Sequence, residues 1–160
     1  MLTFSLVILG LSFLCGLSAA TLSTNLVAYY PFSGNALDVS GNNNHATVYS
    51  AKLAPDKFGT PNTAYEFNGS VYMSITNGDA FNFVDEFTIS LWAKPKPTQP
   101  AYAIILDKSH GYWGWTVLQS AFSTNSFFFA HYYAPGSAYE SLPVQFMTNT
   151  WNHYVATKKN

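Results

Sequence analysis

The feature that most constrains this fold is an alternation of apolar and polar side chains with a period of two residues. It is clearest over residues 86–94 (EFTISLWAK), where Phe87, Ile89, Leu91 and Ala93 fall on one side of an extended chain. Successive strand residues point to opposite faces of a sheet, so this pattern predicts a strand with one buried face. No window long enough for an amphipathic helix shows a helical period, so helices are not expected.

Other segments rich in aromatic and β-branched residues predict further strands. They are residues 64–67, 71–76, 102–107, 113–121, 126–133 and 151–157. Asn68-Gly69 predicts a hairpin between the first two, because both residues tolerate positive φ. Short strands without helices predict an all-β fold, an antiparallel two-sheet sandwich of the jelly-roll type.

Residues 1–20 have the pattern of a secretory signal peptide. An almost unbroken apolar run, Leu2–Leu17, closes on the small residues Ser18-Ala19-Ala20, which predicts cleavage before Thr21 and an extracellular location. No Lys or Arg precedes the run, and an uncleaved membrane anchor is the alternative. We expect residues 21–160 to form the secreted domain, with no membrane span after cleavage.

The charge balance and the cysteine content exclude several classes of function. All seven basic residues are Lys, against eight acids, and the net charge is −1. No basic patch is available to neutralise phosphates, so nucleic acid is not an expected partner. Residues 21–160 contain no cysteine, which excludes disulfides and zinc–thiolate sites from that part of the chain.

Four motifs occur in order along the mature chain. They are LVAYYPFSGNALDVSGNNNHAT at 26–47, AYEFNGSVYMS at 64–74, FTISLWAKP at 87–95 and WNHYVAT at 151–157. In this order and spacing they resemble the laminin-G-like jelly-roll domains of the concanavalin A-like lectin/glucanase superfamily. Two departures are that Ala46 stands where the family usually has Gly, and that the sequence stops at Asn160, where the family continues into its closing strands. We therefore expect residues 21–160 to be a partial domain.

The resemblance implies two antiparallel sheets packed face to face, and a role in binding far more often than in catalysis. Such domains occur in secreted adhesins and lectins and as accessory modules of extracellular enzymes. A fold alone does not settle a function, so the individual sites have to carry the argument.

The loop at residues 38–44 is the candidate metal site. Calcium is bound by carboxylate, amide and backbone oxygens, which this loop offers through Asp38 and Asn42. The resemblance implies that such loops can help to hold a structural calcium ion, often with an acidic ligand from the closing strand. The alternative is a plain turn, because Asp, Ser, Gly and Asn are also the commonest turn residues.

A run of aromatic residues in the second half of the chain forms the candidate ligand face. Sugars stack on exposed aromatic rings, and we expect this face to comprise Tyr112, Trp113, Trp115, Tyr132 and Tyr133. The two tryptophans share one side of the strand if that strand is regular. The alternative is that these rings belong to the core.

No catalytic constellation is visible in the sequence. A glycanase needs two facing carboxylates, but Asp85 and Glu86 are adjacent and would point to opposite faces of a strand. The mature sequence also lacks a Glu-x-Asp-x-x-Glu pattern, a Gly-x-Ser-x-Gly elbow and a His-Glu-x-x-His helix. We do not expect an enzyme.

Asn68-Gly69-Ser70 is a sequon for N-glycosylation, with Asn68 as the acceptor in a cramped turn. Taken with the resemblance, these observations predict a secreted, non-catalytic, lectin-like module that binds a glycan or an extracellular protein surface. The alternative is a protein–protein adhesion or structural accessory module without a sugar site. A glycanase is the third and weakest interpretation.

Overall fold

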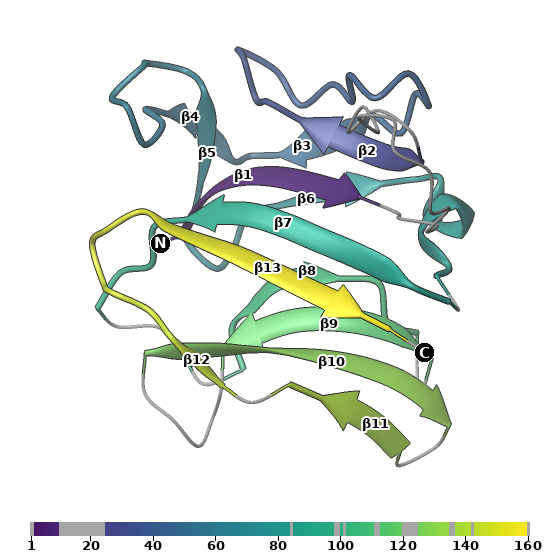
Figure 1. Cartoon of the computed structure of the whole chain (residues 1–160). Coiled ribbons are helices and arrows are strands. Elements are labelled where there is room, and N and C mark those ends of the chain that lie inside the picture. Colours follow the sequence, from purple (N-terminus) through teal and green to yellow (C-terminus); the bar gives the residue numbers. More distant parts are fainter. Residues whose placement is uncertain are drawn as a thin grey trace, which may run out of the picture.

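The computed structural model of the chain describes residues 2–9, 25–83, 85–97, 100, 102–110, 113–119, 125–134, 137–141 and 143–159. These residues form thirteen β-strands and one short 3-10 helix, η1 (Gly78–Phe81). The all-β architecture with antiparallel sheets that the sequence predicted is confirmed (Figure 1). No helix in the described residues is long and apolar enough to cross a bilayer.

The larger sheet has six strands. Its order is β13 (Asn152–Lys158), β7 (Phe87–Ala93), β1 (Leu2–Leu9), β5 (Ala64–Phe67) and β4 (Lys52–Ala54), and β2 (Leu26–Tyr30) also pairs with β1. Every pairing in this sheet is antiparallel. Strand β1 therefore lies inside the sheet, with β7 on one side and β2 and β5 on the other (Figure 1).

Strand β1 belongs to the segment that the sequence predicts to be a signal peptide. Its pairing with β7 runs from Phe4 opposite Ala93 to Leu9 opposite Thr88. The predicted cleavage site before Thr21 lies outside the described residues. The structure is that of the uncleaved chain, so the pairing of β1 with β7 does not test whether cleavage takes place.

The other strands form two smaller sheets. A five-stranded sheet has the order β11 (Ser137–Glu140), β10 (Ser126–Ala134), β9 (Gly114–Gln119) and β8 (Ile104–Asp107), with β12 (Val144–Gln145) also paired to β10. Strands β3 (Ala46–Tyr49) and β6 (Tyr72–Ile75) form a two-stranded sheet. One hydrophobic core contains side chains from all three sheets.

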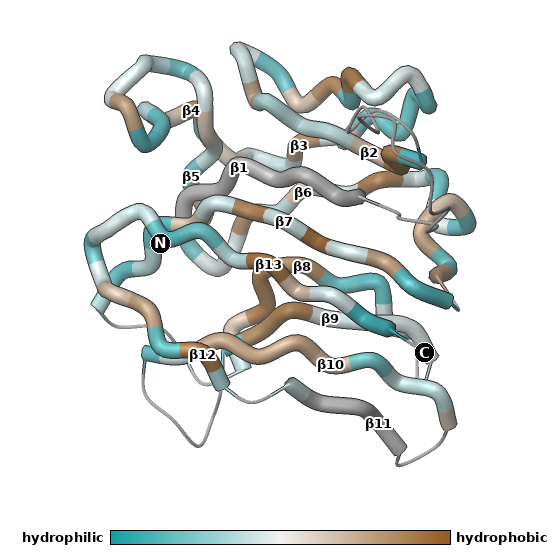
Figure 2. The backbone as a smooth tube through the Cα atoms, in the orientation of Figure 1, coloured by the Kyte–Doolittle hydropathy of each residue, from teal (hydrophilic) through white to brown (hydrophobic). Residues whose placement is uncertain are grey.

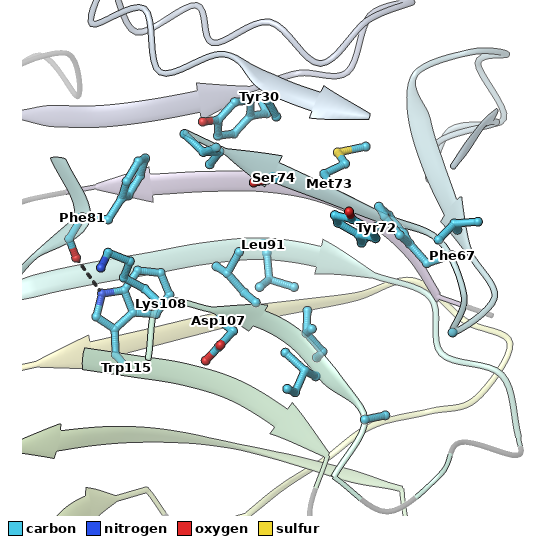
Figure 3. Close-up of a pocket in the computed structure, with 18 of the residues that line it drawn as sticks. Tyr30, Phe67, Tyr72, Met73, Ser74, Phe81, Leu91, Asp107, Lys108 and Trp115 are labelled. Atoms are coloured by element: carbon cyan, nitrogen blue, oxygen red, sulfur yellow. Dashed lines mark hydrogen bonds between the residues drawn. The ribbon is translucent and has the colours of Figure 1, made fainter. Parts of the chain in front are cut away.

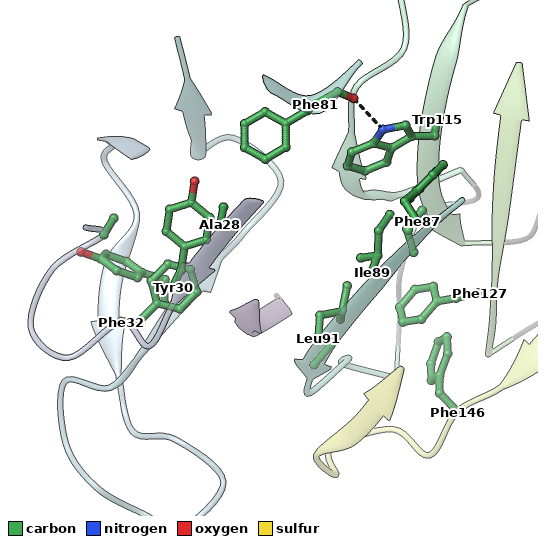
Figure 4. Close-up of a cluster of buried hydrophobic side chains, with 14 residues drawn as sticks. Ala28, Tyr30, Phe32, Phe81, Phe87, Ile89, Leu91, Trp115, Phe127 and Phe146 are labelled. Carbon is green, nitrogen blue, oxygen red and sulfur yellow. Dashed lines mark hydrogen bonds between the residues drawn. The ribbon is translucent and has the colours of Figure 1, made fainter. Parts of the chain in front are cut away.

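Strand β7 builds the middle of this core. Phe87, Ile89, Leu91 and Ala93 are all buried, as the alternation in the sequence predicts, and Figure 2 shows the apolar positions recurring along the strand. The ring of Phe87 lies 5.9 Å from that of Trp115 in the five-stranded sheet, measured between centroids. Figure 4 shows this row of β7 side chains in contact with the aromatic cluster of the opposite layer. The two layers therefore pack face to face.

All seven segments predicted to be strands contain one, namely β5, β6, β7, β8, β9, β10 and β13. The predicted hairpin at Asn68-Gly69 is wrong, because the flanking strands β5 and β6 belong to different sheets. Gly69 does adopt a positive φ of 91°, so the sequence signals a sharp turn correctly. The turn leads the chain from one sheet to the other and does not fold it back on itself.

Candidate functional site

The predicted ligand face lies at one end of β9 and β10. The register pairs Gly114 with Tyr132, so the next residues along, Trp113 and Tyr133, lie at the same end of the two strands. Trp113 is 61% exposed and Tyr133 is 40% exposed, whereas Tyr132 is half-buried. Tyr112 lies outside the described residues. The structure therefore places two exposed aromatic residues at this end of the sheet.

The glycine between the two tryptophans interrupts the regular alternation. Gly114 has a φ of +105°, and a Cβ atom at this position would lie 2.1 Å from the backbone oxygen of Lys108. Trp115 beyond it is only 2% exposed and donates its indole N–H to the carbonyl oxygen of Phe81 at 3.1 Å. The two tryptophans are expected to share one side only if the strand is regular, and the backbone at Gly114 is not regular. Trp115 lies in the core, which is the alternative interpretation of these rings.

The loop before Trp113 carries polar groups, of which His110 lies opposite Trp113. His110 donates its backbone N–H to the carbonyl oxygen of Trp113 at 2.8 Å, and Trp113 donates back to that of His110 at 3.2 Å. The side chains of His110 and Asp107 are exposed. Asp107 Oδ1 accepts the backbone N–H of Ser109 at 3.2 Å and its hydroxyl at 2.7 Å, which orders the loop. An aromatic face beside hydrogen-bonding side chains can bind a sugar.

A cavity of about 720 Å³ lies between the two-stranded sheet and the five-stranded sheet. Figure 3 shows Tyr72, Met73 and Ser74 of β6 on one side of it and Asp107 at the end of β8 on the other. Leu91 of β7 lies between these walls and forms part of the floor (Figure 3). The cavity has the volume of an ordinary ligand pocket, which is about 300–1,000 Å³.

Asp38, the candidate metal ligand, is buried and organises the loop between β2 and β3. Its Oδ1 accepts the backbone N–H groups of Tyr29 at 2.9 Å and Ser40 at 2.8 Å. Its Oδ2 accepts the Ser40 hydroxyl at 2.8 Å and the backbone N–H of Asn44 at 2.9 Å. Burial by itself raises the pKa of Asp38, but these hydrogen bonds outweigh it and hold the pKa below its ordinary value.

This donor set does not fit a cation as it is arranged. Both oxygens of Asp38 already accept two hydrogen bonds each, and Asn42 directs its amide N–H groups to the carbonyl oxygens of Leu26 at 2.6 Å and Val27 at 3.1 Å. Within the described ranges, no three His, Cys, Asp or Glu side chains are grouped so that they could hold a metal ion. Calcium binding by Asp38 and Asn42 is untested, and the hydrogen bonds that occupy Asp38 argue against it.

The outer face of the larger sheet carries a serine–histidine pair. Ser90 Oγ and His153 Nε2 lie 2.8 Å apart. The His153 ring stacks on Trp92 with centroids 4.8 Å apart, and Lys57 Nζ lies 3.6 Å from the centroid of the Trp92 ring. In a catalytic triad a third group orients the base, and the described residues place no carboxylate in hydrogen-bond contact with His153. The pair is therefore seen here without the third group of a triad.

The candidate glycosylation residue lies on the exposed turn between β5 and β6. Asn68 Oδ1 accepts the backbone N–H of Ser70 at 3.0 Å and its hydroxyl at 2.9 Å. These contacts tie the acceptor side chain to its own turn. Glycosylation of Asn68 stays a prediction.

A family model described as the concanavalin A-like lectin/glucanases superfamily, of the laminin G type, matches residues 67–160, which is more than half of the chain. The chain belongs to this family. The matched region includes β6 to β13 and therefore contributes strands to all three sheets, while the motif at 26–47 precedes it. No curated protein and no solved structure matches the chain. Laminin G-like domains are typically non-catalytic, are usually extracellular and bind glycans or extracellular proteins.

Proposed function

We propose that this laminin G-like protein is a secreted, non-catalytic module that binds carbohydrate at the end of β9 and β10. The observation that carries the proposal is the exposed indole of Trp113, at the same end of the two strands as the exposed Tyr133. The apolar face of a sugar ring stacks on the indole, and its hydroxyl groups form hydrogen bonds with His110, which lies opposite Trp113. The apolar run of residues 2–17 and the small residues that follow it support secretion.

The backbone around Trp113 supports its role as a preformed platform. The two backbone hydrogen bonds with His110 hold the main chain of Trp113 in place, and Gly114 follows it with a positive φ of 105°. A backbone that is already ordered loses little conformational entropy when a ligand binds. The indole is thus presented to solvent by an ordered backbone.

A glycan array probed with the full chain tests this function. Once a sugar is found, Trp113→Ala should weaken its binding by at least about tenfold, which corresponds to about 1.4 kcal/mol. Trp113→Phe keeps an aromatic face and should retain most of the affinity. Phe58→Ala is the matched control, because Phe58 is also an exposed aromatic residue but lies in the loop after β4. Sugar binding that survives Trp113→Ala would place the site elsewhere.

The second candidate function is protein–protein adhesion without a sugar site. The observation in its favour is the stack of Lys57, Trp92 and His153 on the outer face of the larger sheet. Aromatic residues are enriched at the energetic centres of protein interfaces. Binding to an extracellular protein that free sugars do not compete away, and that Trp92→Ala abolishes, would favour this function over carbohydrate recognition.

A further inference from the structure

Two asparagines of the chain are followed directly by glycine, at Asn68-Gly69 and at Asn77-Gly78. Asparagine is a chemically labile residue, because the backbone nitrogen of the next residue can attack the carbonyl carbon of its side chain. Glycine in the next position leaves that nitrogen unhindered, since it carries no Cβ atom. The two sites share this dipeptide, so a difference in reactivity between them has to come from their surroundings.

The first site lies on the turn between β5 and β6. Asn68, Gly69 and Ser70 are all exposed to solvent. Asn68 Oδ1 accepts the backbone N–H of Ser70 at 3.0 Å and the Ser70 hydroxyl at 2.9 Å, and these contacts fold the Asn68 side chain back across Gly69. In the described part of the chain, no hydrogen bond occupies the N–H of Gly69. The attacking nitrogen is therefore available, and its target lies on the same turn.

The two donors from Ser70 also favour the reaction itself. When a nitrogen adds to the carbonyl carbon of the Asn68 side chain, negative charge develops on Oδ1. Hydrogen-bond donors that already point at an atom that gains negative charge lower the barrier, as they do in the oxyanion holes of enzymes. Both donors at Asn68 are in place before the reaction begins.

The second site is held in a way that opposes the same reaction. Asn77 Nδ2, which would have to leave as ammonia, donates to Oδ1 of Asn44 at 2.8 Å, and Asn44 is buried. The N–H of Gly78, which would be the attacking group, already donates to the carbonyl oxygen of Thr76 at 2.9 Å. Both hydrogen bonds have to break before a ring can form, which raises the barrier at Asn77.

We propose that Asn68 is a site of spontaneous deamidation in the folded protein and that the fold protects Asn77. The nitrogen of Gly69 gives its proton to the solvent and bonds to Cγ of Asn68, the Cγ–Nδ2 bond breaks, and Nδ2 takes a proton from the solvent and leaves as ammonia. Water then opens the five-membered succinimide ring and leaves aspartate or isoaspartate at position 68. One water molecule is consumed, one ammonia is released, and no atom is oxidised or reduced.

This reaction changes the chemistry of the turn. It adds a negative charge to a chain whose net charge is −1, at a residue that also lines the cavity between the two smaller sheets. It also removes Nδ2 of Asn68, the atom to which an N-linked glycan would be attached. Deamidation and glycosylation of Asn68 therefore exclude each other. The proposal does not rest on carbohydrate binding at Trp113.

The test compares the two sites within the same full chain, produced in bacteria without glycosylation. After incubation at neutral pH, peptide mapping by mass spectrometry should show that Asn68 is converted at least about tenfold faster than Asn77. In urea, where both turns are lost, the two rates should agree within about threefold. Equal rates in the folded chain, or a tenfold ratio that persists in urea, would overturn the proposal, because the fold would then play no part.

Two matched variants test the role of Ser70, with each rate expressed relative to that of Asn77 in the same sample. Ser70→Ala removes the hydroxyl donor but keeps the backbone donor, and should slow deamidation of Asn68 by at least about threefold. Ser70→Thr keeps a hydroxyl and should leave the rate within about twofold of that of the unmodified chain. An unchanged or higher rate in Ser70→Ala would overturn the proposal that this turn promotes the reaction.

Discussion

Asp38 Oδ2 accepts the backbone N–H of Asn44 at 2.9 Å, six residues further along the chain, and both residues are buried. Asn44 in turn donates its amide N–H to the carbonyl oxygen of Val27 at 2.9 Å and accepts from the amide of Asn77 at 2.8 Å through its Oδ1. The Tyr30 hydroxyl donates to the backbone oxygen of Asn44. The loop between β2 and β3 is therefore a hydrogen-bonded unit that closes one end of the core.

We expect Asp38→Ala to destabilise the protein by on the order of 3 kcal/mol, since it leaves several partly buried donors without an acceptor. The measurement is the free energy of unfolding in urea. Asp56→Ala is the control, because Asp56 also accepts the backbone N–H groups of Phe58 and Thr60, but in an exposed loop. Equal losses in the two variants would contradict the role given to the buried loop.

The same hydrogen bonds bear on calcium. Because the four contacts of Asp38 satisfy both of its oxygens, we expect a chelator to leave the melting temperature unchanged. An ion that binds only the folded state at a hundredfold excess over Kd would add about 2.7 kcal/mol of stability, a shift that thermal melting detects easily. A lower melting temperature in chelator, absent from Asp38→Ala, would show that the loop rearranges to hold the ion.

The sequence predicts a strand well where only one face of it is buried. It predicts less well the features that depend on which strands pair with one another. In β7 the sequence alternation predicts the buried residues directly, because burial of one face of a strand imposes that alternation. These residues are Phe87, Ile89, Leu91 and Ala93. The turn at Gly69 is predicted as a turn, but its direction depends on which strands lie beside β5 and β6. Short strands such as β4 and β12 are too brief to show a period.

The sequence predicts which types of residue form the candidate ligand site, but not which of their side chains are exposed. The aromatic sequence around residues 113–115 does identify the region, yet the separation of Trp113 from Trp115 arises from the backbone at Gly114. A glycine inside a strand pattern signals such an irregularity. Asn44 carries no signal of this kind, because a run of three asparagines resembles any polar turn.

Gly114→Ala should be much more destabilising than a glycine substitution elsewhere. A Cβ atom at Gly114 would meet backbone atoms of Lys108 at 2.1 Å, and the residue has a φ of +105°. Gly59→Ala is the matched control, because Gly59 has a φ of +82° but nothing within 4 Å of an added Cβ. Strain at a positive φ alone costs about 1–2 kcal/mol, and we expect Gly114→Ala to cost clearly more in urea unfolding. Similar losses would show that the loop at Lys108 moves aside.

We expect His131 to make the stability of the protein depend on pH in the weakly acidic range. Burial lowers the pKa of His131, and the charge of Lys158 lowers it further, while a hydrogen bond with the backbone of Phe83 opposes the shift. The unfolded chain therefore takes up a proton near pH 6.5, about the ordinary value for histidine, while the folded protein resists protonation. Stability should fall as the pH drops through about 6.5 and continue to fall until the folded state is protonated too. Urea unfolding between about pH 7 and pH 5 should show this slope, and His131→Phe should reduce it. An unchanged slope in that variant would assign the effect to another group.

Cleavage before Thr21 would remove β1 from the inside of the larger sheet. Strand β1 pairs with β7 on one side and with β2 and β5 on the other, so its loss would leave backbone groups of three strands without these partners. We expect N-terminal sequencing of the secreted protein to begin at Thr21, because the apolar run ends on small residues there. We also expect residues 21–160 alone to unfold at lower urea concentration than the full chain, or to associate through the opened strand edges. The decrease in the free energy of unfolding should be a large part of the about 5–15 kcal/mol that keeps a domain folded. Secreted protein that begins at Met1 would contradict the cleavage prediction, and equal unfolding curves for the two forms would show that β1 contributes nothing to the stability of the sheet.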